Sequence, residues 1–191
     1  MIAGVLLAGG AGRRFGGNKL LHPLPDGCAI GVMAARNLVR GLPRSVAVVR
    51  PGDDELAARL EEEGLGVMYC SESLHGMGHS IACGVAATSE AGGWVLALAD
   101  MPFIRSTTIV AVGAAIERGA AIAVAEYRGQ RGHPVGFDMQ LRAELLQLHG
   151  DTGARSLVAR HADLVVRIPV DDSGVMQDID TPADAGHVVG R

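Results

Sequence analysis

The sequence predicts a single α/β domain with a mainly parallel β-sheet, one antiparallel strand and helices on both faces. Short apolar runs alternate with segments whose apolar residues recur at helical spacing, the pattern typical of such folds. The 191 residues suit one domain, and 48% are hydrophobic but only 3% aromatic. We therefore expect one domain over residues 1–191, with a core of Ala, Val, Leu and Ile.

The first half of the chain is expected to supply four strands and three helices. Residues 2–8 form an apolar run that reads as a buried strand, and a glycine-rich loop and a turn at residues 23–27 follow it. The further strands are residues 45–49, 66–70 and 94–99, and the helices are residues 30–39, a segment capped by Asp53 and Asp54 that ends at residue 63, and residues 80–88.

The second half continues this alternation and adds the antiparallel strand. A turn at Gly132-His133-Pro134 precedes a short strand, and Thr181 and Pro182 have the residue types of an N-cap and a first helical position for a last helix. The expected helices are residues 107–118, 139–148 and 153–161, and the expected strands are residues 121–125, 135–137 and 164–170.

The glycine-rich loop after the first strand predicts a phosphate site. Its glycines let backbone N–H groups approach anionic oxygens, and basic side chains add charge at the carboxyl end of a strand, where open α/β sheets bind ligands. The spacing fits neither the dinucleotide G-x-G-x-x-G pattern nor a Walker A loop. The alternative is a flexible connection with incidental basic residues. The loop comprises Leu7, Ala8, Gly9, Gly10, Ala11, Gly12, Arg13, Arg14, Phe15, Gly16, Gly17, Asn18 and Lys19.

Two acidic motifs predict a magnesium site beside this loop. Asp100 follows five apolar residues, so its carboxylate should emerge at the carboxyl end of a buried strand. A carboxylate beside phosphates needs an intervening cation, and Mg²⁺ binds through one or two carboxylates and phosphate oxygens. Asp180 is the second candidate ligand and Asp178 the reserve. The alternatives are a turn cap at Asp100 and a helix N-terminus served by the other two acids.

Three further polar segments are candidate ligand contacts. Gly76-Met77-Gly78-His79-Ser80 could read the edge of a base, or could be a strand-to-helix turn with Ser80 as N-cap. His133 lies beside a predicted turn. Asp151 and Arg155 could cap a helix or bind an anion.

Charge and cysteine content narrow the class of protein. Seventeen basic and 21 acidic residues give a net charge of −4, which argues against a nucleic-acid partner and leaves small anionic ligands. The chain has three cysteines, Cys28, Cys70 and Cys83, an odd number with no C-x-x-C spacing. This pattern favours a reducing cytoplasm. No run suits a signal peptide or a membrane span, so we expect a cytoplasmic protein without membrane contact.

Six motifs along the chain resemble those of the molybdenum cofactor nucleotidyltransferases, particularly the cytidylyltransferases. They are LAGGAGRRFGGNKLL, GMGHS, LADMP, RGHPVGF, GDTGAR and PVDDSGVMQDIDTPAD, they occur in the order expected of that family, and they cover nearly the full length. The first and third mark a wider group that includes sugar-phosphate and isoprenoid-precursor nucleotidyltransferases. The resemblance implies a Rossmann-like fold that binds a nucleoside triphosphate and Mg²⁺.

The resemblance also implies a reaction and a role for each motif. The terminal phosphate of molybdopterin would attack the α-phosphorus of the nucleotide, and pyrophosphate would leave. Gly9, Gly10, Arg14 and Lys19 would cradle the triphosphate, and Asp100 and Asp180 would hold Mg²⁺. Ser80 and its neighbours Gly76, Met77 and Gly78 would face the base, and His133 would lie toward the acceptor.

The choice of base depends on one departure from the cytidylyltransferase pattern. Gly9 stands where those enzymes usually have alanine, and glycine is more familiar there in guanylyltransferases. The NKLL and GMGHS segments are cytidylyl-like, so we expect CTP rather than GTP. The alternatives are guanylyl transfer, a related sugar-phosphate acceptor, and a nucleotide-binding accessory protein that delivers the cofactor; a molybdenum hydroxylase would be the recipient of the product.

Overall fold

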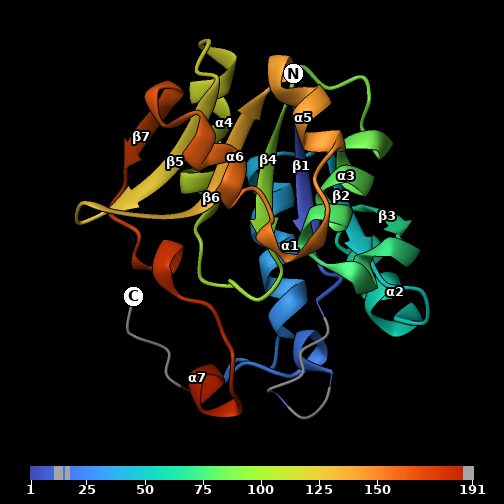
Figure 1. Ribbon diagram of the computed structural model, residues 1–191. Coiled ribbons are helices and arrows are strands. Elements are labelled where there is room, and N and C mark those ends of the chain that lie inside the picture. Colours follow the sequence, from blue (N-terminus) through green and yellow to red (C-terminus); the bar gives the residue numbers. More distant parts are fainter. Residues whose placement is uncertain (11–14, 16–17, 187–191) are drawn as a thin grey trace.

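The computed structural model describes residues 1–10, Phe15 and residues 18–186. Within this part of the chain, seven strands form one sheet in the order β3-β2-β1-β4-β6-β5-β7 (Figure 1). The strands are β1 (Ile2–Leu7), β2 (Ser45–Val49), β3 (Gly66–Tyr69), β4 (Gly93–Leu98), β5 (Ile122–Tyr127), β6 (Gln130–Asp138) and β7 (Val165–Pro169). Only β6 runs antiparallel to its neighbours, β4 and β5, and the other pairs are parallel. The predicted fold class is confirmed.

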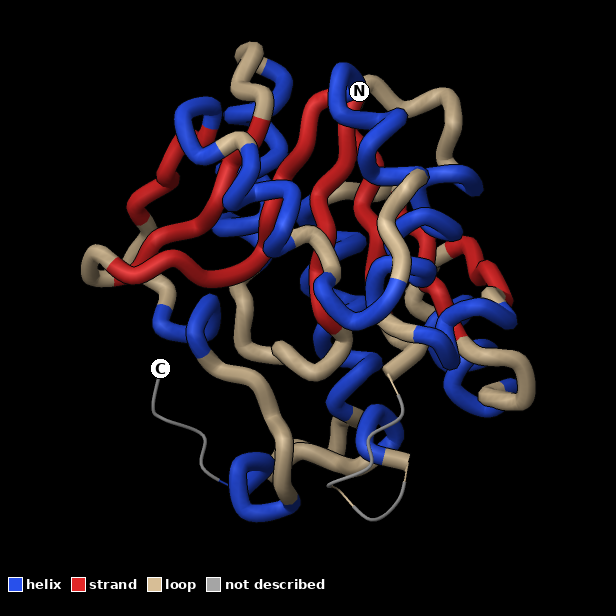
Figure 2. Tube along the Cα trace, viewed as in Figure 1, coloured by secondary structure: helices blue, strands red, loops and turns tan. Residues whose placement is uncertain are grey.

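Helices cover both faces of this sheet, as Figure 2 shows. The α-helices are α1 (Ile30–Gly41), α2 (Asp54–Glu62), α3 (Met77–Ala87), α4 (Ser106–Glu117), α5 (Arg142–Leu146), α6 (Arg155–Arg160) and α7 (Pro182–Gly186). Short 3₁₀ helices include η1 (Lys19–Leu21), η2 (Ser71–His75) and η6 (Ser173–Met176). Among the described helices, none is long and apolar enough to cross a membrane.

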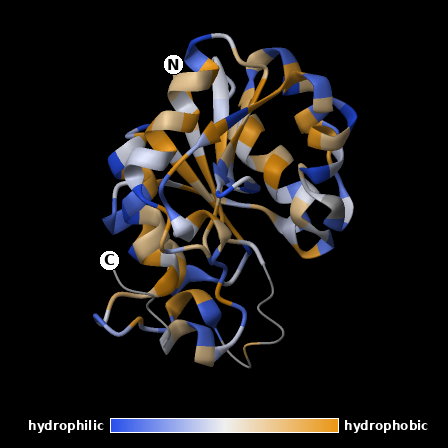
Figure 3. Cartoon of the chain, turned by 90° about the vertical axis from the view of Figure 1, so that its left-hand side faces the viewer, coloured by the Kyte–Doolittle hydropathy of each residue, from blue (hydrophilic) through white to orange (hydrophobic). Residues whose placement is uncertain are grey.

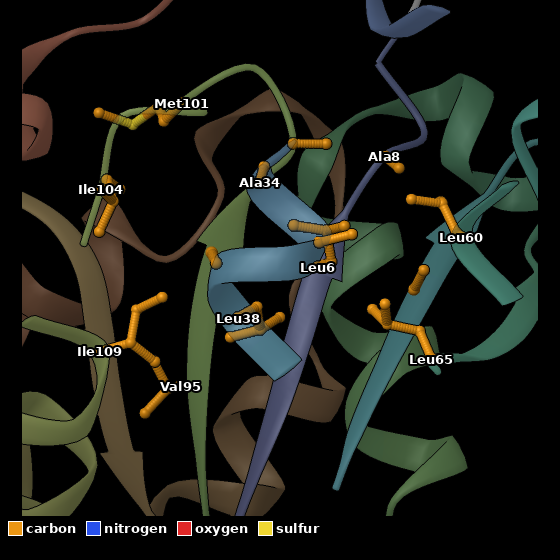
Figure 4. Packing of buried hydrophobic residues seen from close by; sticks show 14 of the residues in the cluster. Leu6, Ala8, Ala34, Leu38, Leu60, Leu65, Val95, Met101, Ile104 and Ile109 are labelled. Carbon is orange, nitrogen blue, oxygen red and sulfur yellow. The ribbon is translucent and has the colours of Figure 1, made fainter. Parts of the chain in front are cut away.

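Side-chain alternation along β1 divides the core into two layers. Ile2 and Leu6 pack with α1, α2 and α4, whereas Ala3 and Val5 pack with α3, α5 and α6 on the opposite face. Successive strand residues point to opposite faces, so a fully buried six-residue strand such as β1 must be apolar throughout. Hydropathy colouring shows these apolar strands at the centre, between the helices (Figure 3). Figure 4 shows Leu6, Leu38 and Val95 in the first layer.

Several predicted element boundaries need correction. The turn predicted at Gly132-His133-Pro134 lies inside β6, which is longer than the expected residues 135–137. Helix α3 begins at Met77 with Gly76 as N-cap, so the predicted start of this helix at residue 80 is wrong, and the alternative in which Ser80 is the N-cap does not hold. Pro182 does begin the last helix. The helix predicted over residues 139–148 is reduced to a 3₁₀ turn followed by α5.

Candidate functional site

Strand register gathers the predicted motifs at one edge of the sheet. Leu7 of β1 pairs with Val48 of β2 and with Leu98 of β4. Gly9, Arg50 and Asp100 each follow one of these three residues by two positions, and the ladder continues through Ala8 N–H to Val48 O at 2.9 Å. In the sheet order, β2 and β3 lie on one side of β1 and β4 lies on the other, so the direction in which strands are added reverses at β1. Such a reversal of strand order is where open α/β sheets form a ligand crevice.

Lys19 lies between two of the predicted acids. Its Nζ donates to Asp100 Oδ2 at 2.9 Å and to Asp180 Oδ1 at 3.3 Å. Burial acts to lower the pKa of Lys19, but the hydrogen bonds and negative charges of Asp100 and Asp180 outweigh it, so the pKa is raised. The ammonium therefore remains charged at neutral pH.

A backbone hydrogen bond brings the second acidic motif to the first. Ile179 N–H donates to Asp100 O at 2.9 Å, which places Asp180 beside Lys19. The backbone N–H groups of Asp180 and Thr181 and the Thr181 hydroxyl all donate to Asp184 Oδ2, which fixes the start of α7. Asp178 does not share the contact to Lys19; its charge acts instead on His133.

The described residues of the site enclose one cavity of about 540 Å³. Eleven residues of the predicted motifs line it: Leu7, Gly9, Gly10, Asn18, Lys19, Gly76, Met77, Ser80, Asp100, Asp151 and Asp180. Segments after β1, β3 and β4, the start of α3 and the segment before α7 therefore contribute to a single pocket. A pocket of this size accommodates a nucleotide-sized ligand.

Other predicted residues lie elsewhere. Ala8 is buried in the core and does not line the cavity. Gly78, His133, Arg155 and Asp178 are also absent from the cavity lining, and Arg155 and Asp178 are exposed. Ala11, Gly12, Arg13 and Arg14 lie outside the described residues, so the predicted contact of Arg14 with phosphate is not addressed by the structure.

The glycines of the 76–80 segment allow another part of the protein, the backbone of residues 149–151, to approach closely. Gly76 has a φ of +124°, and a Cβ there would overlap the backbone of Gly150. A Cβ on Gly78 would lie 2.6 Å from the backbone nitrogen of His149. These two glycines let the start of α3 pack on residues 149–151, which places Met77, Ser80 and Asp151 around the same cavity.

His133 lies in β6, near Asp100 but outside the cavity lining. Its Nδ1 is buried and has no hydrogen-bond partner within the described residues. Burial lowers the pKa of His133, and the negative charges of Asp100 and Asp178 only partly oppose this effect. The imidazole is therefore neutral at neutral pH.

Sequence reasoning missed seven residues that line the cavity. They are Leu20, Arg50, Asp53, Ser73, Leu74, His75 and Leu98. Arg50 donates to both carboxylate oxygens of Asp53, at 2.9 and 3.0 Å. Arg50 follows β2 directly, and this position at the carboxyl edge is the signal that could have identified it.

A disulfide joins Cys70, which follows β3, to Cys83 in α3. This pair was not predicted from the sequence, where the cysteine content favoured a reducing cytoplasm, because the bond depends on contact between positions 13 residues apart in the chain. The bond spans the segment that contains Ser73, Met77 and Ser80, so it fixes this wall of the cavity against α3. Cys28 is free.

The charges that line the cavity suit a divalent cation. Among the described lining residues, Asp53, Asp100, Asp151 and Asp180 face only Lys19 and Arg50 as cations. Asp100 and Asp180 each place a carboxylate oxygen within 3.3 Å of Lys19 Nζ, so the two carboxylates lie close together. Carboxylate oxygens are the ligands that Mg²⁺ and Mn²⁺ prefer. No group of three or more acidic, His or Cys side chains in the described residues could hold a metal, so ligand phosphates would complete the coordination.

Comparison with known proteins shows a family likeness along most of the chain. Residues 4–165 match the MobA-like NTP transferase domain. Nicotine blue oxidoreductase of Paenarthrobacter nicotinovorans is 31% identical over 189 residues, which cover 94% of this chain and 92% of the relative.

Solved structures give the same result. The homologue of Mycobacterium tuberculosis Rv0371c from Mycobacterium sp. strain JC1 has a TM-score of 0.78 and 32% identity, and the match covers 96% of this chain and 92% of that chain. Rv0371c of M. tuberculosis in complex with manganese has a TM-score of 0.72 and 25% identity, over 88% of this chain and 87% of that one.

Proposed function

Because the chain belongs to the MobA-like NTP transferase family, we propose that it transfers a nucleoside monophosphate to the terminal phosphate of a molybdopterin-type acceptor. CTP is the proposed donor, Mg²⁺ the metal and a molybdenum hydroxylase the recipient of the product. The observation that carries the proposal is the arrangement of Lys19, Asp100 and Asp180 beside Gly9 in one cavity at the carboxyl edge of the sheet.

The proposed step is an in-line displacement at phosphorus. An oxygen of the acceptor phosphate forms a bond to the α-phosphorus, the bond from that phosphorus to the oxygen bridging to the β-phosphate breaks, and pyrophosphate leaves. This chemistry requires positioning and charge neutralisation rather than a protein nucleophile. The backbone at Gly9 and Gly10 and the Lys19 ammonium would hold the triphosphate, and Arg14 is proposed to add a second cation.

The acidic pair is proposed to bind the metal. A divalent ion supplies charge neutralisation between the phosphate oxygens of the nucleotide. Asp100 and Asp180 would hold it, and Lys19 would then turn from these carboxylates to the phosphates. The manganese found in the M. tuberculosis relative supports a divalent metal in this fold.

The remaining predicted residues are assigned around this centre. Met77 and Ser80, which line the cavity, are proposed to contact the base, together with Gly76 and Gly78. His133 is proposed to face the acceptor, because its Nδ1 has no partner in the described residues and the charge of Asp100 acts on its ring. Asp151 and Arg155 are proposed to contact the acceptor from the segment that begins α6.

A pyrophosphate-release assay tests the proposal. The protein is incubated with each of the four nucleoside triphosphates, Mg²⁺ and molybdenum-loaded molybdopterin, and parallel reactions contain a hexose 1-phosphate or no acceptor. We expect acceptor-dependent pyrophosphate release with CTP and formation of the dinucleotide product. Turnover with GTP would reassign the donor, turnover with the sugar phosphate would reassign the acceptor, and nucleotide binding without turnover would favour an accessory role.

A further inference from the structure

One side-chain hydroxyl in the cavity wall lacks a hydrogen-bond partner. Ser73, in η2, is only 6% exposed, and its Oγ is buried without a partner in the described part of the chain. The same residue lines the cavity. A buried hydroxyl without a partner destabilises the folded state, so such groups are uncommon in native proteins. A hydroxyl in this state at a cavity wall is suited to bond a ligand.

Ser73 also occupies space next to Gly9. An alanine Cβ at position 9 would lie 2.9 Å from Ser73 Cβ and 3.2 Å from both Ser73 Oγ and Ser80 Oγ. The first distance is shorter than Cβ contacts in real proteins, and Ser73 Cβ is tied to the backbone, so the η2 segment would have to move. The two hydroxyls therefore converge on the position that the alanine methyl would occupy.

The backbone holds Ser73 at this place. Ser73 N–H donates to Cys70 O at 3.2 Å, and Ser73 O accepts from Gly76 N–H at 3.3 Å. Cys70 is in turn fixed by its own N–H bond to Val49 O at 2.9 Å and by the disulfide to Cys83. A residue whose backbone is fixed before a ligand arrives loses little conformational freedom on binding, which favours selective recognition.

The position of Ser73 favours contact with a base rather than with phosphate. In the sheet order β3-β2-β1-β4, the segment after β3 lies on one side of β1, and Asp100 follows β4 on the other side. Leu7, Leu74 and Met77 add apolar surface to the cavity, which suits a planar ring. A hydroxyl can donate to or accept from the polar edge of a base.

We infer that Ser73 is a specificity-determining residue that hydrogen-bonds the nucleotide base, and that position 9 is glycine because the Ser73 side chain fills the space of an alanine methyl. This inference rests on the proposed nucleotide site. A glycine in place of alanine at position 9 therefore does not enlarge the pocket for a purine, because the Ser73 side chain takes up the volume of the missing methyl group.

Titration calorimetry with the full chain and Mg²⁺ tests the assignment, with CTP, GTP and inorganic tripolyphosphate as probes. Ser73→Ala removes only the hydroxyl. We expect the affinity for CTP to fall on the order of tenfold or more, with a change in the CTP-to-GTP ratio and unchanged affinity for tripolyphosphate. Ser71→Ala, an exposed serine of the same 3₁₀ helix, is the matched control and should bind like the wild type.

The Gly9 half of the inference has its own test. Gly9→Ala should lower the melting temperature, and adding Ser73→Gly should restore it without restoring affinity for CTP. Equal nucleotide affinities of Ser73→Ala and the wild type would overturn this inference but not the proposed nucleotide site. The same holds if Ser73→Ala loses affinity for CTP, GTP and tripolyphosphate to the same extent. A wild type that binds none of the probes would instead overturn the proposed nucleotide site, and this inference with it.

Discussion

At the scale of single residues, Lys19 has two roles that a substitution can separate. Its ammonium holds Asp100 and Asp180 together, and it is proposed to stabilise charge that develops on pyrophosphate. Lys19→Gln should lower kcat by roughly a hundredfold, since loss of one such contact costs about 3 kcal/mol in the transition state. The same variant should bind Mn²⁺ more tightly without nucleotide, because no ammonium competes for the carboxylates. Pyrophosphate release and Mn²⁺ titration followed by electron paramagnetic resonance measure the two effects.

The acids on either side of Lys19 can be told apart from their neighbour Asp178. Asp100→Asn and Asp180→Asn keep the size of each side chain but remove the charge that a hard cation needs, so both should weaken Mn²⁺ binding and activity. Asp178→Asn should leave Mn²⁺ affinity within about twofold, a change of under 0.5 kcal/mol, because that acid does not contact Lys19. Loss of Mn²⁺ binding in Asp178→Asn alone would move the second ligand to Asp178.

The site residues that could be predicted from sequence are polar residues that directly follow an apolar strand. Asp100 ends an apolar run, so its place at the carboxyl edge follows from the pattern alone. Ser73 has no such mark, because a serine in a polar loop looks the same whether it faces solvent or a cavity. For Gly76, the sequence left open whether its missing side chain makes room for a ligand or for a turn; the structure shows the backbone of Gly150 close to it, a contact that only the tertiary structure creates.

At the scale of elements, the disulfide is expected to hold α3 to the end of β3. Closing a loop of this length stabilises a protein by about 3 kcal/mol through the entropy of the unfolded chain. The Cys70→Ser/Cys83→Ser double variant should therefore unfold at lower urea than the wild type, and a dithiol should lower the stability of the wild type to the same level. Cys28→Ser, which alters only a free thiol, is the control. Equal stability with and without the dithiol would contradict the prediction.

The ion pair between α1 and the end of α2 predicts a pH effect on stability. Arg36 Nη2 and Nε donate to Glu63 at 2.6 and 3.0 Å, and these hydrogen bonds lower the pKa of Glu63 against the opposing effect of burial. Stability from this pair is present above the ordinary pKa of about 4.5 and is lost as pH falls through the lowered value. Because solvent partly screens the pair, Glu63→Gln should cost at most about 1 kcal/mol at pH 7.

The measurement for this pair is urea unfolding of both proteins from pH 7 to pH 3. The difference in unfolding free energy between Glu63→Gln and the wild type should shrink toward zero at the acid end. Glu62→Gln, at the exposed neighbouring position, should show no such trend. A difference that stays constant over this range would mean that packing rather than charge accounts for the effect of the substitution.

The bounds of an element could be predicted where its apolar residues recur with a clear period, but not where pairing with a neighbouring strand sets those bounds. Strand β2 was predicted with its observed bounds. Strand β6 was cut short because proline and glycine usually end strands. In the structure, Val124 pairs with Val135 and Glu126 with Arg131, so residues 132–134 lie opposite a single residue of β5. Pro134 lies within this irregularity, where a proline is tolerated because the regular ladder is interrupted.

At the scale of the whole molecule, the sheet connects the two ends of the proposed reaction. The segment after β3, on one side of β1, contains Ser73, which is proposed to contact the base, and β4 and β6, on the other side, lead to Asp100 and contain His133. Hydrophobic clusters on both faces include residues of β1 and β4, so the core does not divide between these two parts. This continuity is the physical reason to expect that residues 1–191 unfold as one unit.

Trp94 makes this expectation measurable. It is the single tryptophan, it is fully buried in β4, and its Nε1 donates to Thr88 Oγ1 at 2.8 Å. Its fluorescence therefore reports on the centre of the sheet, whereas far-UV circular dichroism reports on all helices. In urea the two transitions should coincide, as they do for a two-state domain.

Nucleotide binding should move both transitions together. At a CTP concentration of one hundred times Kd, with Mg²⁺ present, binding to the folded state alone should add about 2.7 kcal/mol to the free energy of unfolding. Asp100→Asn under the same conditions should show little of this increase, because its metal site is impaired. A fluorescence transition at lower urea than the circular dichroism transition, or a shift by CTP in only one probe, would show that the centre of the sheet and the helices do not unfold as one unit.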